Sequence, residues 1–258
     1  MKEGGWSKNQ EIAFKQIIKK FFDDKISNAL KTAKNPLKIG DDLSTILKDS
    51  DAEVVRMITP RAIKKWASPA TLSKWEKIME DPRMLAELRI IGKSIANTMR
   101  PLAGNNFSLW VAKILNTHFS EKKIGLKAIT SGKIKSDMTR DLVIKSKKRA
   151  GTTDYKPDID IILVKTSSNE PIAIISAKTT LAERVMQTIS WSRFLKNVPK
   201  KYNGIKLFLV TAWDTFESGA NKERVQELDG VYVCNRKVRE YGNIKLFSKI
   251  VEDIKDIF

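Results

Sequence analysis

Apolar residues recur at helical spacing through much of the first hundred positions. The clearest run lies near the N-terminus, where lysines occupy the face opposite a stripe formed by Ile12, Phe14, Ile17, Ile18, Phe21 and Phe22. This 3.6-residue period predicts an amphipathic helix. Prolines interrupt the segment at Pro36, Pro60, Pro69 and Pro82. Between and after these breaks, the same spacing predicts helices over 51–57, 61–66, 71–79, 83–98 and 105–117.

After residue 118 the pattern changes to short apolar runs of strand length. Such runs occupy 124–130, 158–164, 172–176, 205–211 and 230–234. Helical spacing returns over 180–195, 221–228 and 247–257, and a basic segment without regular pattern spans 133–156. Strands that alternate with helices predict an α/β fold with a mixed central β-sheet flanked by helices. We therefore expect an all-helical N-terminal region over 1–100 and an α/β core over 101–258.

Positive charge is in large excess along the chain. Lys and Arg number 48 against 30 Asp and Glu, which gives a formal net charge of +18. Such an excess adds self-repulsion to the folded protein, but it attracts polyanions and speeds their encounter. A nucleic acid is therefore the expected partner. A lysine-rich composition inherited from an AT-rich genome is the alternative explanation.

Cysteine and histidine occur once each, as Cys234 and His118. One chain therefore offers neither a disulfide framework nor a Cys/His zinc cluster. A Ser–His or Cys–His hydrolase would depend on His118, which ends a predicted helix beside Phe119, where packing or capping is expected. Cys234 lies in an apolar run and is expected to be a buried structural thiol.

No apolar run approaches the ~18 residues of a membrane span. The first residues, Met1 to Trp6, are too polar for a signal peptide. We therefore expect a cytoplasmic protein that has no membrane partner.

The strand-like runs 158–164 and 172–176 are joined by a turn-rich segment centred near Ser168. An antiparallel hairpin about this centre places Asp158 opposite Lys178 and Asp160 opposite Ser176. Because side chains alternate along a strand, all four share one face of the sheet. Two carboxylates, a hydroxyl and an amine are thus expected on one patch.

This combination of groups suits hydrolysis of a phosphodiester. Carboxylate oxygens bind Mg²⁺, and the metal polarises a phosphoryl oxygen and lowers the pKa of a bound water. A lysine can hold the phosphate and help orient or deprotonate the attacking water. A surface ion pair between Asp158 and Lys178 is the alternative without catalysis.

The same residues resemble the motif of a nuclease superfamily. Pro157-Asp158, a hairpin and then Ser176-Ala177-Lys178 resemble the PD-(D/E)XK motif. Thr179-Thr180-Leu181-Ala182-Glu183-Arg184 resembles the segment that follows the catalytic lysine in many type II restriction endonucleases. The resemblance implies a restriction-endonuclease-like core, in which the helical region 1–100 contributes DNA clamping, base readout or dimerisation.

By this resemblance, Asp158 binds Mg²⁺, Lys178 is catalytic and the backbone carbonyl of Ala177 is a further metal ligand. Ser176 departs from the motif, which has an acidic residue at this position. Several restriction enzymes with a non-acidic residue there recruit a carboxylate from a neighbouring helix. The candidates for the second carboxylate are Glu183 and Asp160. A second departure is that the predicted helix 105–117 lacks the early glutamate that related enzymes often carry.

Contacts with DNA are expected from two segments. On the helix 180–195 an apolar stripe is expected to pack on the sheet, while a second stripe carries Arg184 and Gln187, which suit phosphate or bidentate base contacts. The basic run 145–149 is expected to line the DNA backbone. The residues expected to contact DNA are Thr179, Thr180, Arg184, Gln187, Lys147, Lys148 and Arg149. An ion pair of Arg184 with Glu183 or Glu223, and a solvated lysine loop, are the alternatives.

The resemblance implies a Mg²⁺-dependent type II restriction endonuclease of a bacterial or archaeal cytoplasm. It would cut double-stranded DNA at a short specific site as a homodimer, since cutting both strands needs two active sites. A structure-specific or repair nuclease with the same core is one alternative. A non-catalytic DNA-binding protein is another, which the missing acids at Ser176 and in the helix 105–117 would favour.

Overall fold

A computed structural model gives the fold of the chain. The residues that it describes are 8–50, 52–54, 104, 106–133, 144–148, 151–155, 159–179, 184–195, 204–212 and 219–257. Contacts divide the chain into two units, Met1–Ser27 with Thr45–Asn106, and Asn28–Ser44 with Phe107–Phe258. The boundary expected between residues 100 and 101 lies outside the described residues.

The predicted N-terminal helix is present as α1, Lys8–Thr32. Within the first unit its side chains Ile18, Phe22 and Ile26, spaced by four residues, are fully buried, which confirms the amphipathic pattern. Lys25 forms an ion pair with Glu53 at 2.9 Å. Of the helix expected over 51–57, residues 52–54 are described and are helical. The helices expected over 61–66, 71–79 and 83–98 lie outside the described residues.

The second unit is built on the expected mixed sheet, with strand order β1-β4-β5-β6-β7-β8. The strands are β1 (Leu126–Thr130), β4 (Ile161–Lys165), β5 (Pro171–Lys178), β6 (Lys206–Thr211), β7 (Gly230–Val233) and β8 (Ile244–Leu246). The pairs β1–β4 and β4–β5 are antiparallel. From β5 to β8 every neighbouring pair is parallel. The carboxyl ends of β5, β6, β7 and β8 therefore meet at one edge of the sheet.

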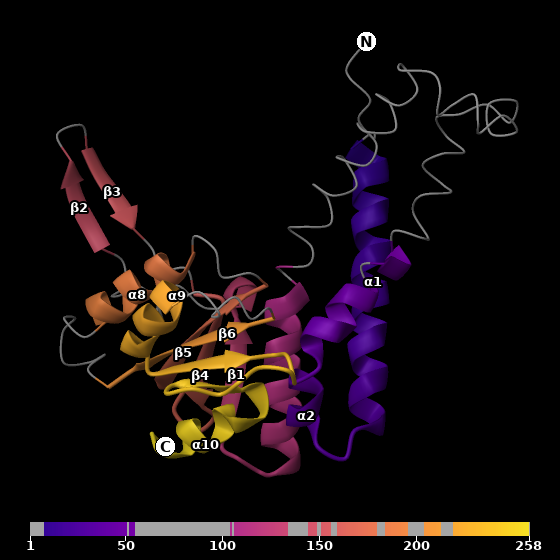
Figure 1. Ribbon diagram of the computed structural model, residues 1–258. Coiled ribbons are helices and arrows are strands. Elements are labelled where there is room, and N and C mark those ends of the chain that lie inside the picture. Colours follow the sequence, from indigo (N-terminus) through magenta and orange to yellow (C-terminus); the bar gives the residue numbers. More distant parts are fainter. Residues whose placement is uncertain are drawn as a thin grey trace, which may run out of the picture. The chain divides into compact units, whose positions relative to one another are not determined.

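Helices cover both faces of this sheet (Figure 1). Helices α8 (Arg184–Leu195) and α9 (Gly219–Arg224) lie over one face, and α10 (Ile250–Lys255) lies over the other. The core under α8 is apolar and includes Ile162, Val164, Ile174, Val185, Ile189, Leu207, Leu209, Val231 and Val233. These strand positions alternate, as expected when each face of a sheet packs on its own helix layer.

The helix over 106–121 is tied to the edge strand β1 by Asn116. The Asn116 side chain donates to the carbonyl of Ala128 at 2.9 Å and accepts from its N–H at 2.8 Å. These bonds satisfy backbone groups that an edge strand leaves open to other chains. Trp110 and Leu115 on the same helix are buried.

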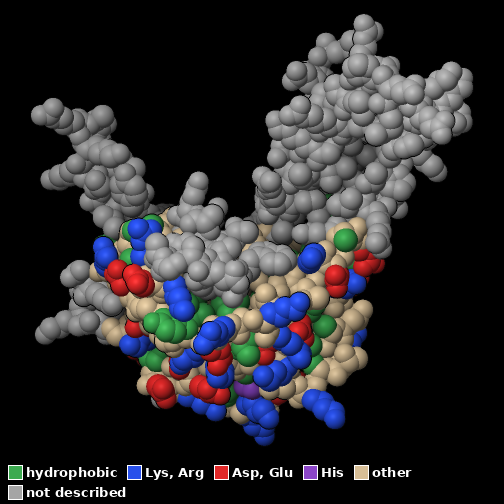
Figure 2. Space-filling model, in the orientation of Figure 1, with side chains coloured by type: hydrophobic (Ala, Val, Ile, Leu, Met, Phe, Trp, Pro, Cys, Tyr) green, Lys and Arg blue, Asp and Glu red, His purple; other side chains and the backbone are tan. Residues whose placement is uncertain are grey.

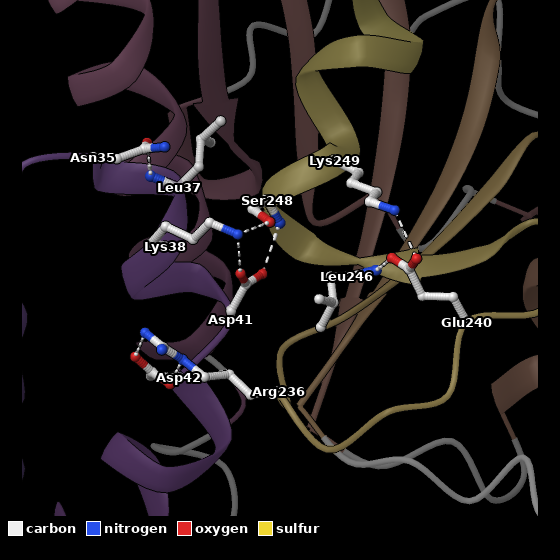
Figure 3. A network of polar contacts seen from close by, with 10 residues as sticks. All are labelled: Asn35, Leu37, Lys38, Asp41, Asp42, Arg236, Glu240, Leu246, Ser248 and Lys249. Atoms are coloured by element: carbon white, nitrogen blue, oxygen red, sulfur yellow. Dashed lines mark hydrogen bonds and ion pairs between the residues drawn. The ribbon is translucent and has the colours of Figure 1, made fainter.

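A short helix, α2 (Pro36–Gly40), is fixed to the C-terminal segment by a network of polar contacts (Figure 3). The Asp41 carboxylate accepts from the backbone N–H of Ser248 at 2.8 Å. Arg236 forms an ion pair with Asp42. Residues 35–42 and the segment after β7, far apart in sequence, are thereby held together.

The sequence predicted no strand in the unpatterned segment 133–156, but ten of its residues form two strands. Strands β2 (Ile144–Lys148) and β3 (Gly151–Tyr155) form a separate antiparallel hairpin, in which Lys145 pairs with Asp154. Both alternating faces of these strands are largely polar, so no apolar period marks them. The short elements α2 and β8 were not expected either.

Candidate active site

The hairpin of β4 and β5 has the register that the sequence predicts. Ile161 pairs with Ile175, Ile162 with Ile174 and Leu163 with Ala173, so the pairs are symmetric about position 168. A bulge between Leu163 and Val164 then shifts the register by one residue before the turn. Continued one residue in the other direction, the register places Asp160 opposite Ser176.

Lys178 ends β5 at the edge where the parallel strands finish. Its partner on β6 is Thr211, which is fully buried, while Ser176 pairs with Leu209. Paired residues of neighbouring strands point to the same face. Ser176, Lys178 and Thr211 therefore lie on the face covered by α8.

An ion pair joins Lys178 to Asp160 on this face. The Lys178 Nζ lies 2.7 Å from Asp160 Oδ2, and the two side chains are 7% and 20% exposed. The same oxygen accepts the backbone N–H of Ala177 at 2.8 Å. A short, charge-assisted bond of this kind holds a buried amine in one position. In the described part of the chain, the carboxylate paired with the lysine is thus Asp160.

Ser176 lines a small pocket between the sheet and α8. The pocket is mostly apolar, and its lining residues are Ile159, Ile174, Ser176, Gln187, Thr188, Trp191, Leu195 and Leu207. Ser176 is itself buried, whereas Gln187 is exposed at the pocket. Helix α8 contains no acidic residue, so it offers no carboxylate to replace the one that Ser176 lacks.

Several residues singled out from the sequence lie outside the described residues. They are Asp158, Thr180, Glu183 and Arg149. Arg184, Lys147 and Lys148 belong to described elements, but only their backbone is described. Thr179 is half-buried and directly follows β5. The structure thus brings together Asp160, Ser176, Ala177 and Lys178.

Two polar residues beside this cluster were missed by sequence reasoning. Thr211 is buried at the end of β6 opposite Lys178, and Thr188 is buried on α8 at the pocket. A sequence signal for Thr211 was available, because this polar residue is the last of a mostly apolar strand and lies at the carboxyl end of β6. Thr188 gave no such signal, because it falls in the apolar stripe of its helix.

His118 and Cys234 are buried, as expected for residues that pack. Burial lowers the pKa of His118, and Lys122 lowers it further. Burial raises the pKa of the Cys234 thiol. Neither side chain lines the pocket at Ser176.

The oxygen donors at this edge are of the kind that Mg²⁺ takes, namely carboxylate and carbonyl groups. Among the described residues, no three acidic, histidine or cysteine side chains are grouped closely enough to hold a metal ion. In the part of the chain that the structure describes, no helix is both long and apolar enough to cross a membrane.

Comparisons with known proteins found restriction endonucleases. Residues 132–256 match the family model for the type 2 restriction endonuclease BsaWI. A curated protein of Methanocaldococcus jannaschii, described as the type II restriction enzyme MjaVIP, is 36% identical over 115 residues, which are 40% of this chain and 50% of the relative. The match thus spans about half the length of that relative.

Solved structures of restriction endonucleases are similar over most of the chain. Ecl18kI in complex with uncleaved, modified DNA has a TM-score of 0.52 at 15% identity, covering 95% of this chain and 83% of that chain. The BsaWI–DNA complex has a TM-score of 0.44 at 12% identity, covering 93% and 90%. The Ecl18kI likeness confirms the expected fold. The family match confirms, for residues 132–256, the resemblance to type II restriction endonucleases.

Proposed function

We propose, from the match of residues 132–256 to the BsaWI restriction endonuclease family, that the protein is a type II restriction endonuclease. It hydrolyses phosphodiester bonds of double-stranded DNA at a short specific site and uses Mg²⁺. The observation that carries the proposal is the buried ion pair of Lys178 with Asp160, at the edge where the strands of this fold end. A lysine amine held in place beside a carboxylate can bind a phosphate and help orient a water.

The chemistry is divided between the metal and the lysine. We assign Asp158 and the backbone carbonyl of Ala177 to Mg²⁺, with Glu183 and Asp160 as the candidates for a second carboxylate. Bound there, Mg²⁺ would polarise the phosphoryl oxygen and lower the pKa of a water. The Lys178 amine holds the phosphate and orients the attacking water. The hairpin expected from the sequence supports this grouping, because its centre at position 168, which the pairing of Ile161 with Ile175 shares, would place Asp158 opposite Lys178.

DNA contacts are proposed for two segments. Thr179, Thr180, Arg184 and Gln187 follow the catalytic lysine, and two of them have a described environment. Thr179 directly follows β5, and Gln187 is exposed on α8 beside the pocket at Ser176. Lys147 and Lys148 belong to β2, and Arg149 follows them in the sequence; the charge of all three suits the phosphate backbone.

The partner and the setting follow from the activity. A palindromic site is cut on both strands by two active sites, which favours a homodimer with two-fold symmetry. The net charge of +18 favours binding to DNA. The expected setting is the cytoplasm of a bacterium or archaeon.

Cleavage of plasmid and phage DNA tests the proposal. With Mg²⁺ we expect discrete fragments of reproducible size, and with EDTA none. Lys178→Ala should lower the single-turnover cleavage rate by about 10³-fold or more, while binding to the cognate duplex stays within about threefold, because the change removes stabilisation of the transition state. Lys206→Ala, which removes an ion-paired lysine at the opposite end of the adjacent strand, is the matched control and should leave the rate unchanged.

Other outcomes would contradict the proposal in different ways. Smeared products or cuts at junctions would indicate a nuclease that recognises structure. Binding without cuts, equal in the wild type and in Lys178→Ala, would mean a DNA-binding protein without catalysis.

A further inference from the structure

The amine of Lys178 is buried, and a buried charge is stable only beside a group that pairs with it. Its side chain is 7% exposed, so little water reaches it. Lysine is almost never buried to this extent without a paired group, because removing its charge from water is costly. One partner that the structure shows is a carboxylate oxygen, Asp160 Oδ2, at 2.7 Å.

Asp160 is itself held by contacts on two sides. Its backbone carbonyl accepts the N–H of Ser131, just after β1, at 2.9 Å. Its Oδ2 accepts the N–H of Ala177 at 2.8 Å, at the position where the ladder between β4 and β5 stops. The side chain thus takes the place of the next strand-to-strand hydrogen bond. It fixes the backbone of β5 at the residue before the lysine.

Six other described carboxylates in the second unit form ion pairs with other cations. The pairs are Glu227 with Arg193, Asp229 with Lys206, Asp253 with Lys245, Glu240 with Lys249, Asp42 with Arg236 and Glu170 with Lys165. Ser176 lies on the same face as Lys178 but carries no charge. Asp160, at 2.7 Å, is a described group that can both neutralise Lys178 and orient it.

We propose that Asp160 is the positioning residue of Lys178 and is not a metal ligand. Its carboxylate, which reaches Lys178 from the neighbouring strand β4, fixes the amine and aligns the Ala177 peptide beside it. The proposal rests on the proposed nuclease function and leaves Glu183 as the candidate for the second metal carboxylate. Binding of Mg²⁺ then does not depend on the charge of Asp160.

The chain contains a matched arrangement that serves as a control. At the amino end of β6, Asp229 accepts the N–H of Leu207 at 2.9 Å and the amine of Lys206 at 3.2 Å. This is the same combination of one carboxylate, one backbone N–H and one lysine, at the opposite edge of the sheet. Asp229→Asn therefore reproduces the chemical change of Asp160→Asn away from the site.

The first experiment measures the reactivity of each lysine and needs neither metal nor DNA. The full-length protein is treated with a limiting amount of acetic anhydride, and mass spectrometry follows acetylation of Lys178 and Lys206. In Asp160→Asn we expect Lys178 to react about tenfold faster, because its buried amine loses the carboxylate that binds it. The reaction rate of Lys206 should not change. Asp229→Asn should raise the reactivity of Lys206 alone. Unchanged Lys178 reactivity in folded Asp160→Asn overturns the proposal.

Asparagine is nearly isosteric with aspartate and keeps an acceptor for the Ala177 N–H, so the variant is expected to fold. If its unfolding midpoint shows that it does not, Asp160→Glu gives the same readout, because the longer side chain moves the charge off the amine. Faster acetylation of Lys178 in that variant supports the proposal, and an unchanged rate overturns it.

The second experiment separates positioning from metal binding. For Asp160→Asn we expect the single-turnover cleavage rate to fall about 10²-fold or more, while cognate DNA binding stays within about threefold. The Mn²⁺ affinity of the protein–DNA complex, measured by titration calorimetry on both proteins, should agree within about twofold. A loss of Mn²⁺ affinity of about tenfold or more would make Asp160 a ligand and overturn the proposal. If the wild type cuts no DNA, the nuclease function fails, and the acetylation experiment still decides the role of Asp160.

Discussion

Tyr232 shows how one buried hydroxyl links three elements of the core. The side chain is fully buried on β7, and its hydroxyl donates to Asp253 of α10 at 2.5 Å. The same carboxylate accepts two contacts of 2.7 Å from Lys245 of β8. Burial raises the pKa of the Tyr232 hydroxyl, and the Asp253 carboxylate raises it further.

This pKa shift predicts a dependence of stability on alkaline pH. The unfolded tyrosine releases its proton near pH ~10 while the folded one keeps it, so its contribution is complete below that pH and is lost as pH rises above it. The free energy of unfolding should fall by about 1.4 kcal/mol per pH unit from this proton alone. Tyr232→Phe should remove that part of the slope in denaturant titrations between about pH 9 and 11. Equal slopes for both proteins would contradict the assignment.

Asp160 also shows at the residue scale where sequence reasoning ends. Alternation places Asp158 and Asp160 on the same face, so the pattern alone cannot decide whether Asp160 contacts Lys178. The answer depends on where regular strand geometry begins. The expected strand started at residue 158, whereas β4 starts at Ile161, and the irregular backbone before it turns the Asp160 carboxylate onto the Ala177 N–H.

At the scale of elements, long and strongly patterned segments were predictable from the sequence. Apolar periods in the sequence predicted the β4–β5 hairpin, its centre at position 168 and the helix after Lys178, because burial of the apolar face stabilises each of these elements. The β2–β3 hairpin lacked such a period because polar residues occupy both of its faces. The strand β8 has three residues and α2 has five, which is too short for a period to register.

The packing of α2 against the C-terminal segment gives a prediction at this scale. A Cβ at Gly40 would overlap Cδ1 and Cε1 of the Phe247 ring, which is fully buried. Gly40→Ala should therefore lower the free energy of unfolding by about 1–3 kcal/mol, since a tightly packed contact must shift. Denaturant midpoints measure this effect.

Gly104→Ala is the matched control for this change. Gly104 is helical, and a Cβ there meets no atom within 4 Å. The control should keep or slightly raise the stability, because alanine favours helix over glycine. Equal midpoints for the two variants would show that the contact of Gly40 with Phe247 does not limit packing.

For the whole molecule, the distribution of charge matters as much as its sum. The chain carries +18, and Lys and Arg side chains are spread over the face in Figure 2 with Asp and Glu among them. On the described part of this face the cations are not gathered into one patch, and such a surface gives a broad attraction to a polyanion. Specificity for a sequence would then have to come from direct contacts with base edges.

Salt should therefore weaken DNA binding strongly. We expect the affinity for a cognate duplex to fall about 10²-fold or more between roughly 50 and 200 mM salt, because each phosphate contact releases counterions. A duplex of the same length and scrambled sequence should show a similar slope at lower affinity. Fluorescence anisotropy at four salt concentrations is sufficient to measure both slopes. Affinity that does not change with salt would contradict a binding mode dominated by phosphates.

The parallel pairing of β5 with β6 has a consequence for the order in which the protein is made. Strand β4 is synthesised directly before β5, whereas β6 is synthesised only after helix α8. Strand β6 pairs with β5, and just beyond this pairing the Lys178 carbonyl accepts the N–H of Ala212 at 3.2 Å. Non-local pairs of this kind form late, since the intervening chain must first be ordered. A nascent chain that ends at Lys178 therefore carries this amine before β6 can pair with β5. Under the proposed nuclease function, the active site therefore assembles only after synthesis has passed residue 212.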